Sequence, residues 1–194
     1  NLSLNSNFTK RYNDYKNFIT LSGAVNYSIE TKRLRGGIKG YYKFNAINNA
    51  AVTASIGTKV EQFNSLEPIP KFHNTLSSLF FEKNYMKIYD RTFAKVNYSM
   101  ELFNGLSFNS SLSYEKRKAL FNSTDYTIFP KALIDYSSNN PLEPNTFETA
   151  AFLNHDLLKF SLGIRIRFGE KFMTYPDLKI ILNDSDYPRL FLNY

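Results

Sequence analysis

The stretch LKFSLGIRIRF, residues 158–168, alternates between two kinds of side chain at every position. One set is apolar and large: Leu158, Phe160, Leu162, Ile164, Ile166 and Phe168. The other set is small or charged: Lys159, Ser161, Gly163, Arg165 and Arg167. Alternation with a period of two over this length predicts a β-strand with one apolar face and one polar face.

The same alternation recurs along most of the chain. It covers FITLSGAVNYSIE at 18–30, GIKGYYKFN at 37–45, AVTASIGTKV at 51–60, and two strands within 93–117. Shorter stretches around 178–182 and 190–194 follow the same rule. The sequence therefore predicts an all-β fold, an antiparallel meander of about eight strands.

The segment 93–117 is predicted to be a hairpin that turns at Asn104-Gly105. A two-residue loop would pair Phe103 with Leu106 and set the apolar faces on opposite sides. A three-residue loop would instead pair Leu102 with Leu106 and keep both apolar sets on one face. We therefore expect the three-residue loop, a type I turn with Gly105 in the left-handed position of a G1 bulge.

Two long connections interrupt the strands. Within 64–92, apolar residues at helical spacing follow Pro68 and Pro70, which predicts one inserted helix near 72–89. The connection 118–156 is rich in Asn, Ser and Pro, with a short helix expected near 146–156. TKRLR at 31–35 and AINN at 46–49 are expected to be turns.

Amino-acid composition limits the kinds of site and partner that the protein can have. The 194 residues include no Cys, which excludes disulfides and thiolate metal sites. The formal net charge of +7 suits nucleic acid, anionic lipid or lipopolysaccharide phosphate. Mean hydropathy of −0.37 resembles that of a soluble protein, but transmembrane β-strands are only half apolar and escape this measure.

Several predicted strands have roughly ten residues or more, the length that crosses a bilayer at a tilt of about 40°. Soluble sandwiches usually have strands of about five or six residues. We therefore interpret residues 1–194 as one domain that forms part or all of a transmembrane β-barrel. The long connections 64–92 and 118–156, and TKRLR, would then be extracellular, and the short turns periplasmic.

The barrel model assigns side chains to two solvents. The candidate lipid face consists of Ile19, Leu21, Val25, Tyr98, Met100, Leu102, Leu106, Phe108, Phe160, Leu162, Ile164 and Ile166. The candidate basic lumen face consists of Lys39, Lys43, Lys59, Lys159, Arg165 and Arg167. Few acids accompany these cations, so the interior of an open barrel is expected to favour anions.

Particular phrases also resemble a known family. These are VEQFN at 60–64, PIP at 68–70, EKNYMKIYD at 82–90, NGL at 104–106, EKRKALFN at 115–122, NNP at 139–141, NH at 154–155, YPDLKI at 175–180 and YPRLFLNY at 187–194. They resemble a family of bacterial outer-membrane barrels of unknown function. Full members carry an N-terminal carboxypeptidase-regulatory-like domain, so the resemblance implies an internal or C-terminal part of such a protein. It implies a fold and a location but no catalytic residue.

Alternatives remain for the chemistry. His155, within NHD at 154–156, or His73 would serve an outer-membrane hydrolase, although no GxSxG motif accompanies them. NDSD at 183–186 has the opening spacing of a calcium loop but lacks its Gly and distal Glu, so an Asx-type turn is expected instead.

Basic residues on strand faces near Tyr41 raise the possibility of a nucleic-acid surface. Such a surface needs aromatic residues on the basic face, but most aromatic residues here alternate onto the opposite face, which disfavours nucleic-acid binding.

The sequence thus predicts an outer-membrane protein with a structural, transport or envelope-assembly role and no enzymatic activity. Its expected partners are outer-membrane lipid, lipopolysaccharide and other envelope proteins, with no nucleic acid, metal or cofactor. The alternatives are the barrel hydrolase and a soluble β-rich binding module.

Overall fold

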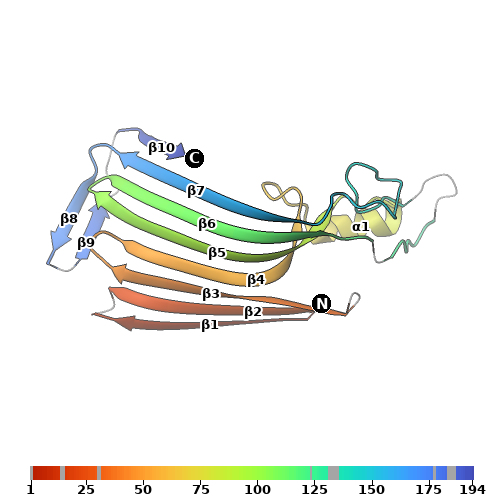
Figure 1. Cartoon of the computed structure of the whole chain (residues 1–194), viewed down its shortest axis with the longest axis horizontal. Coiled ribbons are helices and arrows are strands. Elements are labelled where there is room, and N and C mark those ends of the chain that lie inside the picture. The colour runs from red at the N-terminus through yellow and green to blue at the C-terminus, as the bar shows by residue number, and fades with distance from the viewer. Residues whose placement is uncertain are drawn as a thin grey trace.

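The fold is a long, open antiparallel sheet, seen in a computed structural model of the chain (Figure 1). The structure describes residues 2–13, 16–29, 32–122, 124–130, 136–176, 178–182 and 187–194. The eight strands of the main sheet are β1 (Leu2–Tyr12), β2 (Asn17–Ser28), β3 (Arg33–Asn45), β4 (Ala50–Gln62), β5 (Ile88–Phe103), β6 (Leu106–Ala119), β7 (His155–Arg167) and β10 (Arg189–Asn193). Each pairs with the next in that order, and β1 and β10 form the two edges.

Two further elements lie at the ends of this sheet. A small hairpin, β8 (Lys171–Tyr175) paired with β9 (Leu178–Leu182), lies at the end where the short turns are. The helix α1 (Lys71–Phe81) lies at the opposite end with the long connections (Figure 1). The all-β meander is therefore confirmed, whereas the sheet is open, so closure into a barrel stays a prediction.

Strand register keeps each kind of side chain on its own face. One row across the sheet is polar or hydroxyl-bearing throughout: Thr9, Thr20, Tyr41, Thr53, Asn97, Ser111 and Ser161. The adjacent row, on the other face, is almost wholly apolar: Phe8, Leu21, Gly40, Ala54, Val96, Leu112 and Phe160. Because directly paired residues share a face, the alternation along each strand becomes two continuous surfaces.

The apolar surface is not covered by any other part of the described chain. Ile38, Ile56 and Leu158 expose 64%, 61% and 68% of their area. Among the described residues, the buried apolar side chains are only Ala46, Ala50, Ala51 and Tyr89. A soluble domain of this size buries a far larger apolar core, so the stability of this sheet depends on something that covers its apolar face.

Glycines bring β3 and β4 close together. Gly57 pairs with Gly37 in a row of the polar face, and a Cβ built on Gly57 would lie 2.6 Å from the carbonyl oxygen of Gly36 and 2.7 Å from the Cα of Gly37. Both contacts are shorter than real Cβ atoms allow, so only glycine fits at position 57. A hollow of about 460 Å³ beside these glycines is lined by Leu4, Ser6, Gly23, Ala24, Val25, Gly36, Gly37, Ile38, Ile56 and Gly57.

The β5–β6 hairpin corrects one prediction and confirms another. Gly105 is left-handed at φ 79°, as expected. The register, however, pairs Phe103 with Leu106 and Glu101 with Ser107, so the predicted Leu102–Leu106 pair is wrong. A bulge at Leu102 absorbs one residue, and Met100 therefore still pairs with Phe108 on the apolar face. The apolar residues of β5 and β6 therefore still share one face, but the bulge at Leu102, and not a Leu102–Leu106 pair, keeps them there.

Helix α1 is shorter than the predicted 72–89. It ends at Phe81 because Glu82 takes the left-handed conformation at φ 61°, and the Lys83 amide then donates to the Ser77 carbonyl at 3.1 Å. The next residues turn back onto the helix, where the Asn74 carboxamide oxygen accepts from the amides of Tyr85 (2.8 Å) and Met86 (2.7 Å). Positions 88 and 89 already belong to β5.

Two other local predictions are wrong. No helix forms among the described residues of 146–156, because side-chain bonds such as Asn140 Nδ2 to the Thr149 carbonyl (3.3 Å) hold irregular turns there, and β7 begins at His155. TKRLR is not wholly a turn, since β3 begins at Arg33. AINN at 46–49 is a turn, as predicted. NDSD at 183–186 lies outside the described residues.

The NNP motif orders the long connections. Asn139 is 4% exposed, and its carboxamide donates to the carbonyls of Ile88 (2.7 Å) and Leu120 (2.6 Å) and accepts from the Ile88 amide (2.8 Å). One side chain therefore joins the start of β5 and the end of β6 to the 118–156 connection. Bonds to several backbone groups at once explain why an amide is required at this position.

Candidate functional site

The polar face of the sheet carries the charged side chains that are candidates for function. All six predicted basic residues share it: Lys39 and Lys159 lie in one row, Lys59 in a second, Lys43 in a third, and Arg165 and Arg167 near the short turns. The twelve residues predicted to face lipid share the opposite face, except that Leu102 occupies the bulge. That lipid and a lumen meet these faces stays a prediction.

Glu115 organises the cations near the middle of the polar face. Its carboxylate is 1% exposed and contacts three cations: Arg91, Arg117 at 2.8 Å and Lys159 at 3.3 Å. Arg91 also reaches Glu61 at 2.7 Å. A buried carboxylate with three cations is stable because each partner offsets the desolvation of the other. At this level two carboxylates, Glu61 and Glu115, pair with four cations, Lys59, Arg91, Arg117 and Lys159, so the local charge stays positive.

Sequence reasoning missed this cluster, although the signal was available. Glu115, Arg117 and Arg91 have the same strand parity as the predicted polar residues of β5 and β6. Only the cross-strand register shows that Arg91 faces Arg117 directly. Two like charges directly opposite each other repel, and the Glu115 carboxylate, which contacts both arginines, offsets this repulsion.

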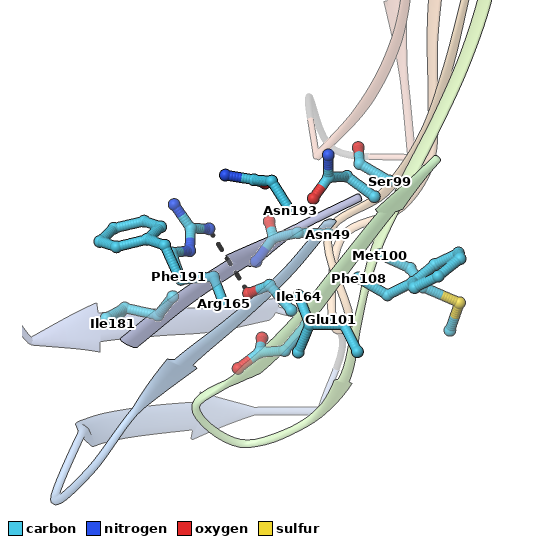
Figure 2. Close-up of a pocket in the computed structure, with 12 residues that line it drawn as sticks. Asn49, Ser99, Met100, Glu101, Phe108, Ile164, Arg165, Ile181, Phe191 and Asn193 are labelled. Carbon is cyan, nitrogen blue, oxygen red and sulfur yellow. Dashed lines mark hydrogen bonds between the residues drawn. The ribbon is translucent and has the colours of Figure 1, made fainter. Parts of the chain in front are cut away.

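A cavity of about 370 Å³ lies near the short turns (Figure 2). Its polar wall is built from two neighbouring rows of the sheet. One row is Ser99, Asn109, Gly163 and Asn193, and the next is Glu101, Ser107, Arg165 and Phe191. Ile181 of β9 and Asn49 of the β3–β4 turn complete it, whereas Met100 and Phe108 point away on the other side of the sheet.

The β8–β9 hairpin closes the cavity at its short-turn end. Lys179 of β9 is 6% exposed, forms an ion pair with Glu101 and donates to Asn104 Oδ1 at 2.9 Å. Its ammonium also lies 5.4 Å from the centroid of Phe172. The tight turn at Asn104-Gly105 thus holds the hairpin against the polar face. A buried Lys–Glu pair with a third polar contact is a specific link rather than a surface contact.

Arg165 is the charged group of this cavity with the fewest contacts. Its Nη2 donates to Ser107 Oγ at 3.4 Å (Figure 2), and its buried Nε has no hydrogen-bond partner among the described residues. Neighbouring Arg167 is instead paired with Glu170. A guanidinium that lines a cavity and makes one long hydrogen bond is suited to carboxylate or phosphate oxygens.

The two histidines belong to different elements and make separate contacts. His73 is in α1, where its ring meets Phe72. His155 begins β7; its Nδ1 lies 2.9 Å from the Leu153 carbonyl, and its ring packs on Phe152. Neither of these contacts has the Ser–His–Asp arrangement that nucleophilic catalysis requires. Within the described ranges there is also no group of three or more His, Asp or Glu residues that could hold a metal.

Among residues that the structure describes, no helix is both long and apolar enough to span a bilayer. Comparison with protein families matches residues 1–194 to the model described as Family of unknown function (DUF5686) C-terminal domain. No curated protein matches the chain significantly. No solved structure does so either.

Proposed function

The chain belongs to the family of the DUF5686 C-terminal domain, and we propose that its sheet is part of a β-barrel in the bacterial outer membrane. The observation that carries this proposal is the exposed apolar face of a long antiparallel sheet. Lipid hydrocarbon is the occupant that suits it, since the face is continuous across eight strands and polar residues line the other side. The fold and family do not identify a specific activity, so the proposed role is structural, transport or envelope assembly.

The height of the apolar face supports a bilayer as its solvent. On β7 the outward apolar residues extend from Leu158 to Ile166. At about 3.4 Å per residue and a tilt of about 40°, these eight steps rise about 21 Å, most of the apolar band of about 25 Å on known barrels.

Chemistry at both ends of the apolar face supports the same proposal. Toward the long connections, the outward positions after Leu158 and Tyr114 are Asp156 and Lys116, and the Tyr114 hydroxyl donates to Asp156 at 2.5 Å. Charges beside a tyrosine are typical of the interface between hydrocarbon and headgroups.

Toward the short turns, Tyr42 lies 6.4 Å from Tyr12 and 5.6 Å from Phe44, measured between ring centroids. Aromatic residues near both ends correspond to the two girdles of an outer-membrane barrel.

The open edges indicate that the barrel needs more strands than the main sheet supplies. β1 has 11 residues and β10 has 5, and they lie at opposite edges. Unpaired backbone groups are too costly in hydrocarbon to face lipid. We propose that further strands close the barrel, and that this domain follows the carboxypeptidase-regulatory-like domain expected from the sequence resemblance.

The polar face would then line an aqueous interior in which cations exceed carboxylates. Such an interior favours anionic solutes. The proposed partners are outer-membrane lipid, lipopolysaccharide and other envelope proteins, and we propose no enzymatic activity. The soluble-module alternative is disfavoured because the described residues bury only four apolar side chains.

The test is extraction of membranes from Gram-negative cells that produce the whole protein. We expect the protein to sediment with the outer membrane, to resist alkaline carbonate and to dissolve only with detergent, because its apolar face is covered by lipid. A matched soluble periplasmic protein serves as the extraction control. Release of the folded protein by carbonate, or recovery as a soluble monomer, would contradict the proposal.

A further inference from the structure

We propose that the cavity between the polar face and the β8–β9 hairpin binds a small sugar phosphate, with its phosphate on Arg165. The cavity volume of about 370 Å³ is within the range of small-ligand sites. The inference depends on the proposed function only because an aqueous interior gives solutes access to the polar face.

Arg165 is the residue that would bind the phosphate group of the ligand. Its guanidinium lines the cavity and makes one long hydrogen bond, from Nη2 to Ser107 Oγ at 3.4 Å. Arg189 is paired in register with Arg167 beside it, so the local potential is positive. Phosphate oxygens match the guanidinium fork and offset this charge.

The row of the sheet next to Arg165, which contains Ser99, Asn109, Gly163 and Asn193, would bind the sugar. Asn109 and Asn193 flank Gly163, whose missing side chain leaves room for the Asn109 carboxamide: a Cβ at Gly163 would overlap that amide. Asn49 and Ser99 add further donors and acceptors at the cavity. Carboxamides present both a donor and an acceptor, which sugar hydroxyls require. Phe191, next to Arg165, offers an exposed ring against which a sugar ring can stack.

The acid in the cavity does not oppose this ligand. Glu101 lines the site, but its carboxylate is 5% exposed and is neutralised by Lys179. Among the residues that line the cavity, the pair thus leaves Arg165 as the charged group available to a solute. A ligand with one anionic group and several hydroxyls therefore fits better than a cation or an apolar molecule.

The experiment titrates the detergent-solubilised protein with glucose 6-phosphate, glucose or inorganic phosphate by isothermal calorimetry. We expect glucose 6-phosphate to bind about tenfold more tightly than either part alone, because both ends of the cavity are used. Arg165→Gln should weaken glucose 6-phosphate about tenfold or more and leave glucose unchanged. Arg165→Lys should give an intermediate affinity, since it keeps the charge but loses the fork.

Lys39→Gln is the matched control, because it removes a charge from the same face outside the cavity. Circular dichroism checks that each variant keeps its β-structure. Equal loss in Lys39→Gln and Arg165→Gln would show general attraction to the face and overturn the site. Absence of binding by folded, detergent-dependent protein would also overturn the site, while the proposed function would stand. Protein that folds without detergent would overturn the proposed function, and the same titration in buffer then decides the site.

Discussion

Gly105→Val is expected to prevent the β5–β6 hairpin from closing properly and to lower the free energy of unfolding by about 2–4 kcal/mol. Position 105 is left-handed at φ 79°, which a β-branched residue resists. Any Cβ there would also collide with the Arg167 carbonyl oxygen, and the Gly105 carbonyl accepts from the Arg167 amide at 2.8 Å. The variant therefore strains both the turn and its contact with β7.

Urea unfolding in detergent micelles, followed by circular dichroism, measures this loss. Gly23→Val is the matched control, because a Cβ at Gly23 meets no atom within 4 Å and valine suits a strand. A midpoint for Gly105→Val equal to that of Gly23→Val would show that the turn tolerates a side chain.

Glu115→Gln is expected to have an effect of similar size. The variant leaves Arg91, Arg117 and Lys159 facing one another without the carboxylate that they share. Breaking a buried ion pair costs about 3–5 kcal/mol, and we expect about 2–3 kcal/mol here because Lys159 is half exposed and water screens it. The free energy of unfolding in the same micelles measures the effect.

Glu148→Gln provides the control, since it removes a carboxylate from an exposed connection. Added salt should partly rescue Glu115→Gln, because it screens the repulsion among the remaining cations. A loss no larger than that of Glu148→Gln, or one insensitive to salt, would contradict the assigned role of Glu115.

The two faces could be predicted from sequence because strand pairing preserves parity. Once residues 158–168 are assigned to a strand, the register transfers their alternation to β6 and β10. The bulge at Leu102 shows why this prediction is robust: it changes the pairing at the turn yet restores Met100 to its place opposite Phe108. The hydrophobic pattern, more than the turn, decides the register.

Features that depend on one local conformation could not be predicted. Apolar spacing continues past Phe81, but the left-handed Glu82 ends the helix there. The strand β8 was missed because Phe172 and Met173 are adjacent and both apolar, so this segment does not alternate with a period of two. β1 was also missed, although Leu2, Leu4 and Phe8 alternate with polar residues and carry the same signal as the longer strands.

Only part of the candidate site could be predicted from the sequence, because the site also depends on local conformation. The sequence predicted that Arg165 lies on a polar face, and the structure places it in a cavity. The partners that shape this cavity come from distant positions: Lys179 reaches back to Glu101 and Asn104 across the sheet. Period-two patterns carry information along a strand but none about a hairpin that folds over its end.

We expect the two faces of this sheet to meet different solvents, lipid on one side and water on the other. Four residues of β7 test it most directly, because Leu162 and Ile164 point to one face and Ser161 and Arg165 to the other. Nitroxide labels are placed singly at these positions in protein reconstituted into lipid vesicles, and their collisions with oxygen and with a water-soluble nickel chelate are measured. The proposal predicts that labels at 162 and 164 favour oxygen, which dissolves in lipid, and that labels at 161 and 165 favour the chelate. Equal accessibility to the chelate at all four positions would contradict the membrane-spanning sheet.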